Sequence, residues 1–155
     1  MIEVREVIVG IEKSKICNDT LRALPNWFGI EASIVDYVEQ VKKMPFYAAY
    51  NNDTPIGFVA IKVHNAYTAE ICVMGVLKEY HRQGIGKMLV KCCDEYCREN
   101  KMDFLTVKTL DESRESKSYE KTRLFYLSVG FKPLEIFPLL WDKDNPCLFM
   151  AKSIR

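Results

Sequence analysis

The stretch that decides the fold is Val76-Leu77-Lys78-Glu79-Tyr80-His81-Arg82-Gln83-Gly84-Ile85-Gly86-Lys87. It starts at the end of an apolar strand, passes through a polar turn with two glycines, and enters a segment with helical periodicity. A strand, turn and helix in this order direct backbone N–H groups and the positive end of the helix toward one point. The stretch therefore predicts a turn that can bind a phosphate group.

Two common nucleotide-binding motifs do not fit this turn. A Rossmann fingerprint needs a third glycine where Leu89 stands. A Walker loop needs glycine at His81 and Ser or Thr at Met88. On the glycines alone, an ordinary strand-to-helix turn without a ligand remains the alternative.

The periodicity on either side of the turn predicts the other elements. Before it we expect strands over residues 2–9, 46–50, 56–63 and 70–77, and helices over residues 11–24 and 33–44. After it we expect a helix whose apolar face carries Ile85, Met88, Leu89, Cys92 and Tyr96, with the ion pairs Lys91/Glu95 and Asp94/Arg98 on its surface. A strand should follow over residues 104–110, and then a helix from an N-cap at Ser118 to Val129, with Gly130 as its C′ residue. The last two strands are expected over residues 131–137 and 147–154. This order predicts an α+β fold around one mostly antiparallel sheet, in a single domain over residues 1–155.

Composition excludes several classes of protein. The 22 Lys and Arg residues nearly balance the 21 Asp and Glu residues, and the longest basic run is Lys42-Lys43, so no nucleic-acid partner is expected. The six cysteines form no C-x-x-C pair and lie apart from both histidines, which predicts neither a metal site nor a disulfide framework. The N-terminus lacks a signal-peptide core, and no apolar run approaches the ~18 residues of a membrane span. We therefore expect a cytoplasmic protein without a membrane partner.

The turn resembles motif A of the GNAT acetyltransferases, Q/R-x-x-G-x-G/A, with His81 in the Q/R position. In this family the strand before the motif splays from its neighbour. The resemblance therefore implies that the backbone of Met74 and Val76 pairs with the pantetheine arm of acetyl-CoA, and that Gly75 forms a β-bulge. It also implies that amides of the turn hold the pyrophosphate of this co-substrate: Arg82, Gln83, Gly84, Ile85, Gly86 and Lys87.

A second stretch, residues 124–131, resembles motif B of the same family. It carries Tyr126 four residues before Gly130-Phe131. The resemblance implies that Tyr126 points at the thioester sulfur and protonates the leaving thiolate. Without the resemblance, a packed aromatic residue beside Phe125 is the more common role of such a tyrosine. The family has an Asn for pantetheine seven residues before the Tyr, where this chain has Tyr119.

Glu70 is the candidate general base. In the histone acetyltransferase branch of the family a strand Glu precedes the first motif A glycine by 14 residues, as Glu70 precedes Gly84 here. On a regular strand Glu70, Cys72 and Met74 share one face, with Glu70 about 13 Å from Met74, so Glu70 would reach the amine through water. The alternative is a strand-edge charge in solvent.

Other side chains are left with two interpretations each. His64 and His81 could act as bases, although single histidines in such positions are more often surface residues. Trp27 and Phe28 could line the acceptor pocket or fill the core.

Together the motifs predict a GNAT fold, a mixed and mostly antiparallel sheet of six to seven strands flanked by four helices. The expected activity is acetyl transfer from acetyl-CoA to a primary amine, by direct attack in a ternary complex. A catalytically silent acyl-CoA-binding module that serves a protein partner is the alternative. The sequence does not identify the acceptor, and the resemblance leaves a homodimer open.

Overall fold

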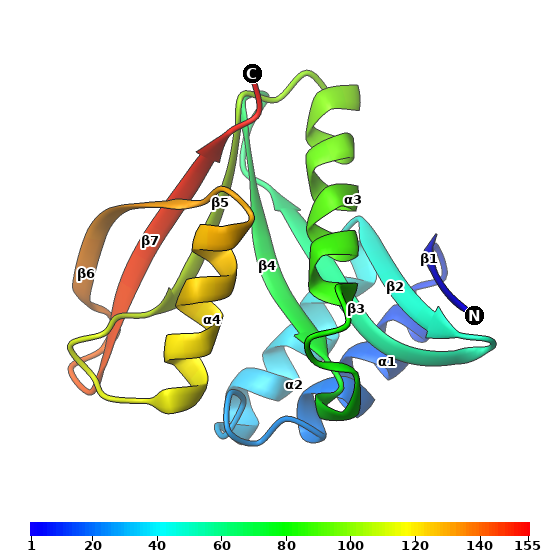
Figure 1. Cartoon of the computed structure of the whole chain (residues 1–155), viewed down its shortest axis with the longest axis horizontal. Coiled ribbons are helices and arrows are strands. Elements are labelled where there is room, and N and C mark those ends of the chain that lie inside the picture. The colour runs from blue at the N-terminus through cyan, green and yellow to red at the C-terminus, as the bar shows by residue number, and fades with distance from the viewer.

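The computed structural model describes residues 1–155 and contains one seven-stranded sheet with the order β1-β2-β3-β4-β5-β7-β6 (Figure 1). Its strands are β1 (Ile2–Glu6), β2 (Phe46–Asn51), β3 (Thr54–Val63), β4 (Thr68–Val76), β5 (Phe104–Leu110), β6 (Lys132–Asp142) and β7 (Asn145–Ser153). Its helices are α1 (Gly10–Arg22), α2 (Glu31–Gln40), α3 (Ile85–Glu99) and α4 (Lys117–Ser128), with short 3-10 turns at Val41–Lys43 and Lys78–Tyr80. Only β4 and β5 are parallel. The predicted fold class is confirmed.

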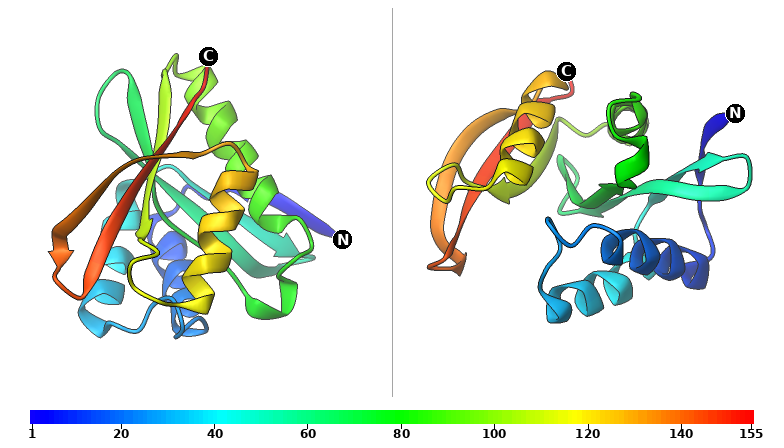
Figure 2. Two further views of the ribbon diagram at one scale, coloured as in Figure 1. Left: turned by 60° about the vertical axis from the view of Figure 1, so that its left-hand side comes forward. Right: turned by 60° about the horizontal axis from the view of Figure 1, so that its bottom comes forward.

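The helices cover the sheet unequally. On one face, α1 packs against β3 and β4, and α2 lies against α1. On the other face, α3 crosses β2 to β5 and α4 packs against β5 (Figures 1 and 2). Each face has its own apolar cluster, because side chains alternate between the faces of a strand. Phe46 and Phe58 lie under α1, and Leu105 and Val107 lie under α3 and α4.

The strands β4 and β5 pair over a short distance and then diverge (Figure 1). Their ladder joins Thr68–Ile71 to Phe104–Val107 and stops there. From Cys72 to Val76, β4 has β3 as its only strand partner. The predicted splay of this strand is therefore confirmed.

A β-bulge in β4 corrects the expected geometry of Glu70. The register passes from Ala60↔Val73 to Ile61↔Ile71, so Cys72 is the extra residue and Gly75 forms no bulge. An extra residue reverses the alternation of side chains, so Glu70 and Met74 do not share a face. Glu70 lies on the face of α1, and Met74 packs with the cluster under α3.

Gly75 has a different role from the predicted one. A Cβ atom there would lie 3.1 Å from Leu24 Cδ1 and 3.2 Å from Thr20 Cγ2. The missing side chain lets α1, and Leu24 just beyond its end, approach β4 closely.

The predicted face of α3 is wrong by part of a turn. Its buried side chains form an i, i+4 row, to which Val90 is added beside Leu89: Ile85, Leu89, Val90, Cys93 and Cys97. Met88 is 37% exposed, and Cys92 and Tyr96 are only half-buried. Neither predicted ion pair, Lys91/Glu95 or Asp94/Arg98, forms. Asp94 binds Lys152 of β7 in place of Arg98 (Nζ to Oδ2, 2.9 Å).

The N-cap of α4 is Ser116, not Ser118. Ser116 has extended backbone angles (φ −162°, ψ 117°), and its hydroxyl accepts a hydrogen bond from the Tyr119 N–H at 3.3 Å. Gly130 is the C′ residue as predicted, with φ +104°.

Several strand boundaries also differ from the predicted ones. β1 ends at Glu6, while β6 extends to Asp142. The register of β6 with β7 passes from Phe137↔Cys147 to Asp142↔Asn145, so residues 138–141 bulge out of the hairpin.

The chain offers no membrane-spanning helix, since none of its helices is both long and apolar enough to cross a bilayer. All six cysteines are free thiols. No group of three or more His, Cys, Asp or Glu side chains is placed to hold a metal ion.

Candidate active site

The turn between β4 and α3 leaves backbone donors free. Gly84 is the N-cap of α3 with φ +80°, and Arg82 also has a positive φ, +64°. A non-glycine residue in this region stores strain, which is common at ligand sites. No side chain caps α3, and its first turn contains no acidic residue. The amides of Ile85, Gly86 and Lys87 therefore have no partner within the helix, as a bound anion requires.

Most side chains of this turn point into solvent and leave the space around its backbone open. Arg82, Gln83 and Lys87 are exposed, and Ile85 is buried in the core, so Ile85 offers only its backbone. A Cβ atom on Gly84 would meet nothing within 4 Å. Glycine is favoured at this position for its backbone angles and not for space.

Gly86 is constrained by packing between two helices. A Cβ atom there would lie 2.9 Å from Cζ of Phe125 on α4. Gly86 thus lets the ring of Phe125 lie against the start of α3. This contact holds α4 beside the turn.

The edge of β4 beyond the ladder is the second element of the site. Leu77 donates its N–H to Ile56 O of β3 at 2.9 Å. Because N–H groups alternate along a strand, those of Met74 and Val76 point away from β3, toward the gap left by β5. The carbonyl oxygen of Val76 lies 2.7 Å from His81 Nε2, so His81 fixes the end of this edge.

Tyr126 lies on α4, the helix that packs against β5 on the other side of this gap. Phe131 N–H donates to Tyr126 O at 3.0 Å and Gly130 N–H to Leu127 O at 3.1 Å, which is a Schellman motif. The rings of Tyr126 and Phe131 meet edge to face at 5.5 Å, so Gly130-Phe131 holds Tyr126 in place.

The hydroxyl of Tyr126 makes no hydrogen bond within the protein, although only 7% of the residue is exposed. Burial raises the pKa of this phenol, with smaller contributions from Tyr119 and Cys93. The hydroxyl therefore keeps its proton at neutral pH and is free to donate it in a hydrogen bond.

Tyr119 fastens a loop to α4. Its hydroxyl donates to Trp27 O at 2.6 Å, and Trp27 Nε1 donates to Thr122 Oγ1 at 3.0 Å and to Ser118 O at 3.2 Å. The Trp27 ring also meets His81 edge-on at 5.6 Å. Trp27 therefore bridges the turn and α4, whereas Phe28 packs with Tyr37 under the other face.

Glu70 is a buried member of a polar cluster, not a charge in solvent. Only 7% of the residue is exposed. Its carboxylate accepts from Lys108 Nζ at 3.1 and 3.2 Å and lies 2.6 Å from His64 Nε2. A carboxylate has no proton to donate, so Nε2 of His64 carries the proton of this hydrogen bond. His64 is thus more than a surface residue.

A sequence model of the acetyltransferase (GNAT) domain matches residues 42–133. The chain belongs to the GNAT acetyltransferase family. The match includes the whole of the turn, α3 and α4.

Solved structures share the GNAT fold at low sequence identity. A GNAT-family protein from Desulfovibrio desulfuricans is 12% identical over 100% of both chains, with a TM-score of 0.85. An aminoglycoside 6′-N-acetyltransferase complexed with coenzyme A is 20% identical over 99% of this chain and 97% of its own, with a TM-score of 0.78. A GNAT acetyltransferase from Elizabethkingia anophelis with acetyl-CoA bound is 18% identical over 98% and 97%, with a TM-score of 0.72. No curated protein matches the chain in sequence.

The sequence did not predict two contacts of the candidate site. The sequence around Lys108 did not indicate its contact with Glu70, because that contact depends on the register Glu70↔Thr106 between β4 and β5. The bond between Tyr119 and Trp27 joins residues 92 positions apart. Only the departure at Tyr119 from the family's Asn pointed to a changed contact there.

Proposed function

We propose that this chain is an acetyl-CoA-dependent N-acetyltransferase, acting as a single domain over residues 1–155 on a primary amine. The observation that carries the proposal is the meeting of three features at the gap between β4 and β5: the uncapped start of α3, the unpaired edge of β4 and the free hydroxyl of Tyr126. Direct attack by the amine in a ternary complex needs these three features and a base.

The residues around the gap fit acetyl-CoA, which supplies an activated thioester carbonyl when bound. The N–H groups of Met74 and Val76 would hold the pantetheine arm as an added strand would. The turn from Arg82 to Lys87 would hold the pyrophosphate on free amides, aided by the positive end of α3. Coenzyme A and acetyl-CoA in the two solved complexes support this assignment.

Glu70 would act as the base through a water molecule. An amine with a pKa near 10 is protonated at neutral pH and must lose a proton before it attacks. The bulge at Cys72 puts Glu70 on the face of α1 and Met74 on the other face. The acceptor would therefore approach from the α1 face. His64 bridges Glu70 to solvent, since 34% of its side chain is exposed.

Tyr126 and the amide of Met74 would stabilise charge as the bonds change. The Met74 N–H donates to the carbonyl oxygen, and the Tyr126 hydroxyl donates to the departing sulfur. The raised pKa of Tyr126 opposes full proton transfer to a thiolate whose conjugate acid has a pKa near 8.5. Of the two protons that the ammonium loses, one ends on the sulfur of CoA and the other in solution.

The test compares Gly84→Asp with Gly84→Asn. Both side chains tolerate a positive φ, and a Cβ atom at Gly84 meets no neighbour, so both variants are expected to fold. They differ in one negative charge beside the proposed pyrophosphate site. Calorimetry should find acetyl-CoA bound at least tenfold more weakly by Gly84→Asp than by Gly84→Asn. Equal affinities in two folded variants would remove the turn from the binding site.

A silent acyl-CoA-binding module is the second candidate, since the same turn and β4 edge would serve it. It has no need of the free hydroxyl of Tyr126. Tight acetyl-CoA binding without acetylation of any peptide, polyamine or alkylamine would favour the module.

We also propose a reducing location such as the cytoplasm. All six cysteines are free, and Cys17, Cys93, Cys97 and Cys147 have no exposed surface. Free thiols in this number are typical of a reducing compartment.

A further inference from the structure

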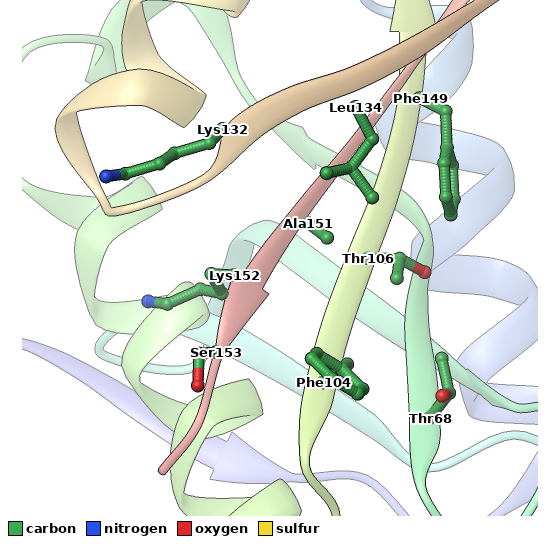
Figure 3. A pocket seen from close by; sticks show the side chains of 9 residues that line it. All are labelled: Thr68, Phe104, Thr106, Lys132, Leu134, Phe149, Ala151, Lys152 and Ser153. Atoms are coloured by element: carbon green, nitrogen blue, oxygen red, sulfur yellow. The ribbon is translucent and has the colours of Figure 1, made fainter.

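Two adjoining hollows lie on the face of the sheet that α1 and α2 leave bare. Their volumes are about 490 and 430 Å³, and both are lined by Thr68, Thr106 and Phe149. They form one groove across β4, β5, β7 and β6, called here the sheet groove. Figure 3 shows its outer part, where Phe104, Leu134 and Phe149 surround Thr106.

The inner end of the sheet groove lies at the proposed base. His64 and Lys108 line the inner hollow, and both hold the Glu70 carboxylate. The last paired residues of β4 and β5, Ile71 and Val107, are one position beyond Glu70 and its neighbour Thr106. Glu70 therefore lies next to both this end of the groove and the opening where the strands part.

The walls of the groove combine apolar side chains with polar ones, among them Asn65 and Thr68. Phe137 and Leu140 of β6 close the inner hollow, and Leu140 comes from the bulge over residues 138–141. Phe104 and Leu134 close the outer hollow. The hydroxyl of Thr106 is already used, because it donates to Ala69 O at 3.3 Å.

The groove has no negatively charged side chain to pair with a second positive charge on the acceptor. Neither hollow is lined by an Asp or Glu. Lys108 is paired with Glu70, and Lys152 is paired with Asp94. The ammonium groups of Lys132 and Lys152 point away from the apolar side chains in Figure 3. A polycation bound here would lose its hydration without gaining a counter-charge.

We propose that the sheet groove binds the body of the acceptor, and that the acceptor is a primary amine on an uncharged apolar chain or ring. This inference rests on the proposed function, with the amine placed at Glu70. A volume of about 490 Å³ is in the range of small-molecule sites. The apolar side chains of the groove would then select the body of the acceptor, and Glu70 would select its amino group.

The first test compares amines with the wild-type enzyme. From ethylamine to hexylamine, kcat/KM should rise about fourfold for each methylene that the groove buries. Phenethylamine should be a good acceptor, and spermidine and kanamycin should be at least 100-fold poorer than hexylamine. A kcat/KM that is flat along the series, or highest for spermidine or kanamycin, overturns the proposal.

The second test uses two neighbouring leucines. Both are exposed (Leu139 74%, Leu140 53%), but only Leu140 lines the groove. Leu140→Asn should raise the KM for hexylamine at least tenfold, and Leu139→Asn less than twofold. Neither change should alter acetyl-CoA affinity. Equal effects of the two substitutions overturn the proposal.

Calorimetry separates this proposal from the proposed function, because it needs no turnover. Hexylamine binding that Leu140→Asn weakens supports the groove even if no amine is acetylated. Acetylation of amines by a protein that binds no hexylamine leaves the function standing and overturns the groove. If the wild type sediments as a dimer that Leu140→Asn dissociates, and hexylamine does not bind, the groove is an interface between two copies of the chain.

Discussion

At the scale of single residues, Tyr126 combines a packing role with a free hydroxyl. Its ring is held by Phe131, while its hydroxyl has no partner in the protein. Tyr126→Phe keeps the ring and removes only the donor. We expect kcat and kcat/KM to fall together, by about 10²–10³-fold, because the hydrogen bond forms only as the sulfur departs. The melting temperature should change little, and turnover at the wild-type rate would exclude Tyr126 from the mechanism.

Glu70 is expected to affect rate and not cofactor binding. Glu70→Gln keeps the size of the side chain and a carbonyl oxygen for Lys108, but it removes the base. The loss of a general base lowers kcat by about 10²–10⁴-fold, and the low-pH limb of the rate profile should move or vanish. The control is acetyl-CoA affinity, measured by calorimetry. Nearly full kcat with hexylamine would mean that the amine loses its proton elsewhere.

At the scale of elements, Lys152 ties three of them together. Its ammonium binds Asp94 of α3 at 2.9 Å and donates to Val129 O at the end of α4 at 2.7 Å. Both side chains of the ion pair are only about 15% exposed (14% and 15%). Lys152→Met leaves Asp94 buried without its partner, which should lower the free energy of unfolding by about 3–5 kcal/mol.

The matched control for this pair is Lys152→Met combined with Asp94→Asn. Removing the orphaned charge should restore part of the lost stability, so urea unfolding should find the double variant more stable than Lys152→Met alone. Additive losses would show that the ion pair does not couple α3 to β7.

The elements themselves were largely predictable, because apolar periodicity and glycine positions are local signals. Residues 104–110 and the cap at Gly130 agree with the structure. The bulge at Cys72 was not predictable, since it depends on which residues of β3 and β4 face each other. The buried row of α3 was also misjudged, because Cys93 and Cys97 are as apolar as Cys92 and Tyr96. Only the position of the sheet decides between the two faces.

At the scale of the whole molecule, the splay divides the sheet into two parts joined by a short ladder. The backbone of the turn and of β4 lies on one part, and Tyr126 lies on the other. Phe125 against Gly86 and Trp27 against α4 connect the parts across the opening. The two sequence motifs predicted which residues lie on each side of this opening. They gave neither the groove nor its apolar lining, because those arise from long-range pairing of β5, β6 and β7.

The stability of the whole fold should decline in alkali, because cysteine thiols are buried in both apolar clusters. Cys17 and Cys93 have no exposed surface. Burial raises the pKa of Cys17 to about 12 and that of Cys93 well above its ordinary value. Below a pH of about 8.5 both thiols are neutral in the folded and unfolded chains, so they leave stability unchanged. Above it the unfolded chain loses these protons and the folded chain does not.

Each such thiol should therefore lower the free energy of unfolding by about 1.4 kcal/mol per pH unit above about 8.5, and the loss from Cys17 should continue until its folded pKa is reached. Urea unfolding between pH 7.5 and 10, with a reductant present, measures this slope. Cys17→Ala is the matched variant, because it removes one buried thiol and little volume. The free energy of unfolding of this variant should fall less steeply with pH than that of the wild type, by about 1.4 kcal/mol per pH unit. Parallel pH profiles for the two proteins would mean that Cys17 ionises as readily in the folded chain as in the unfolded one.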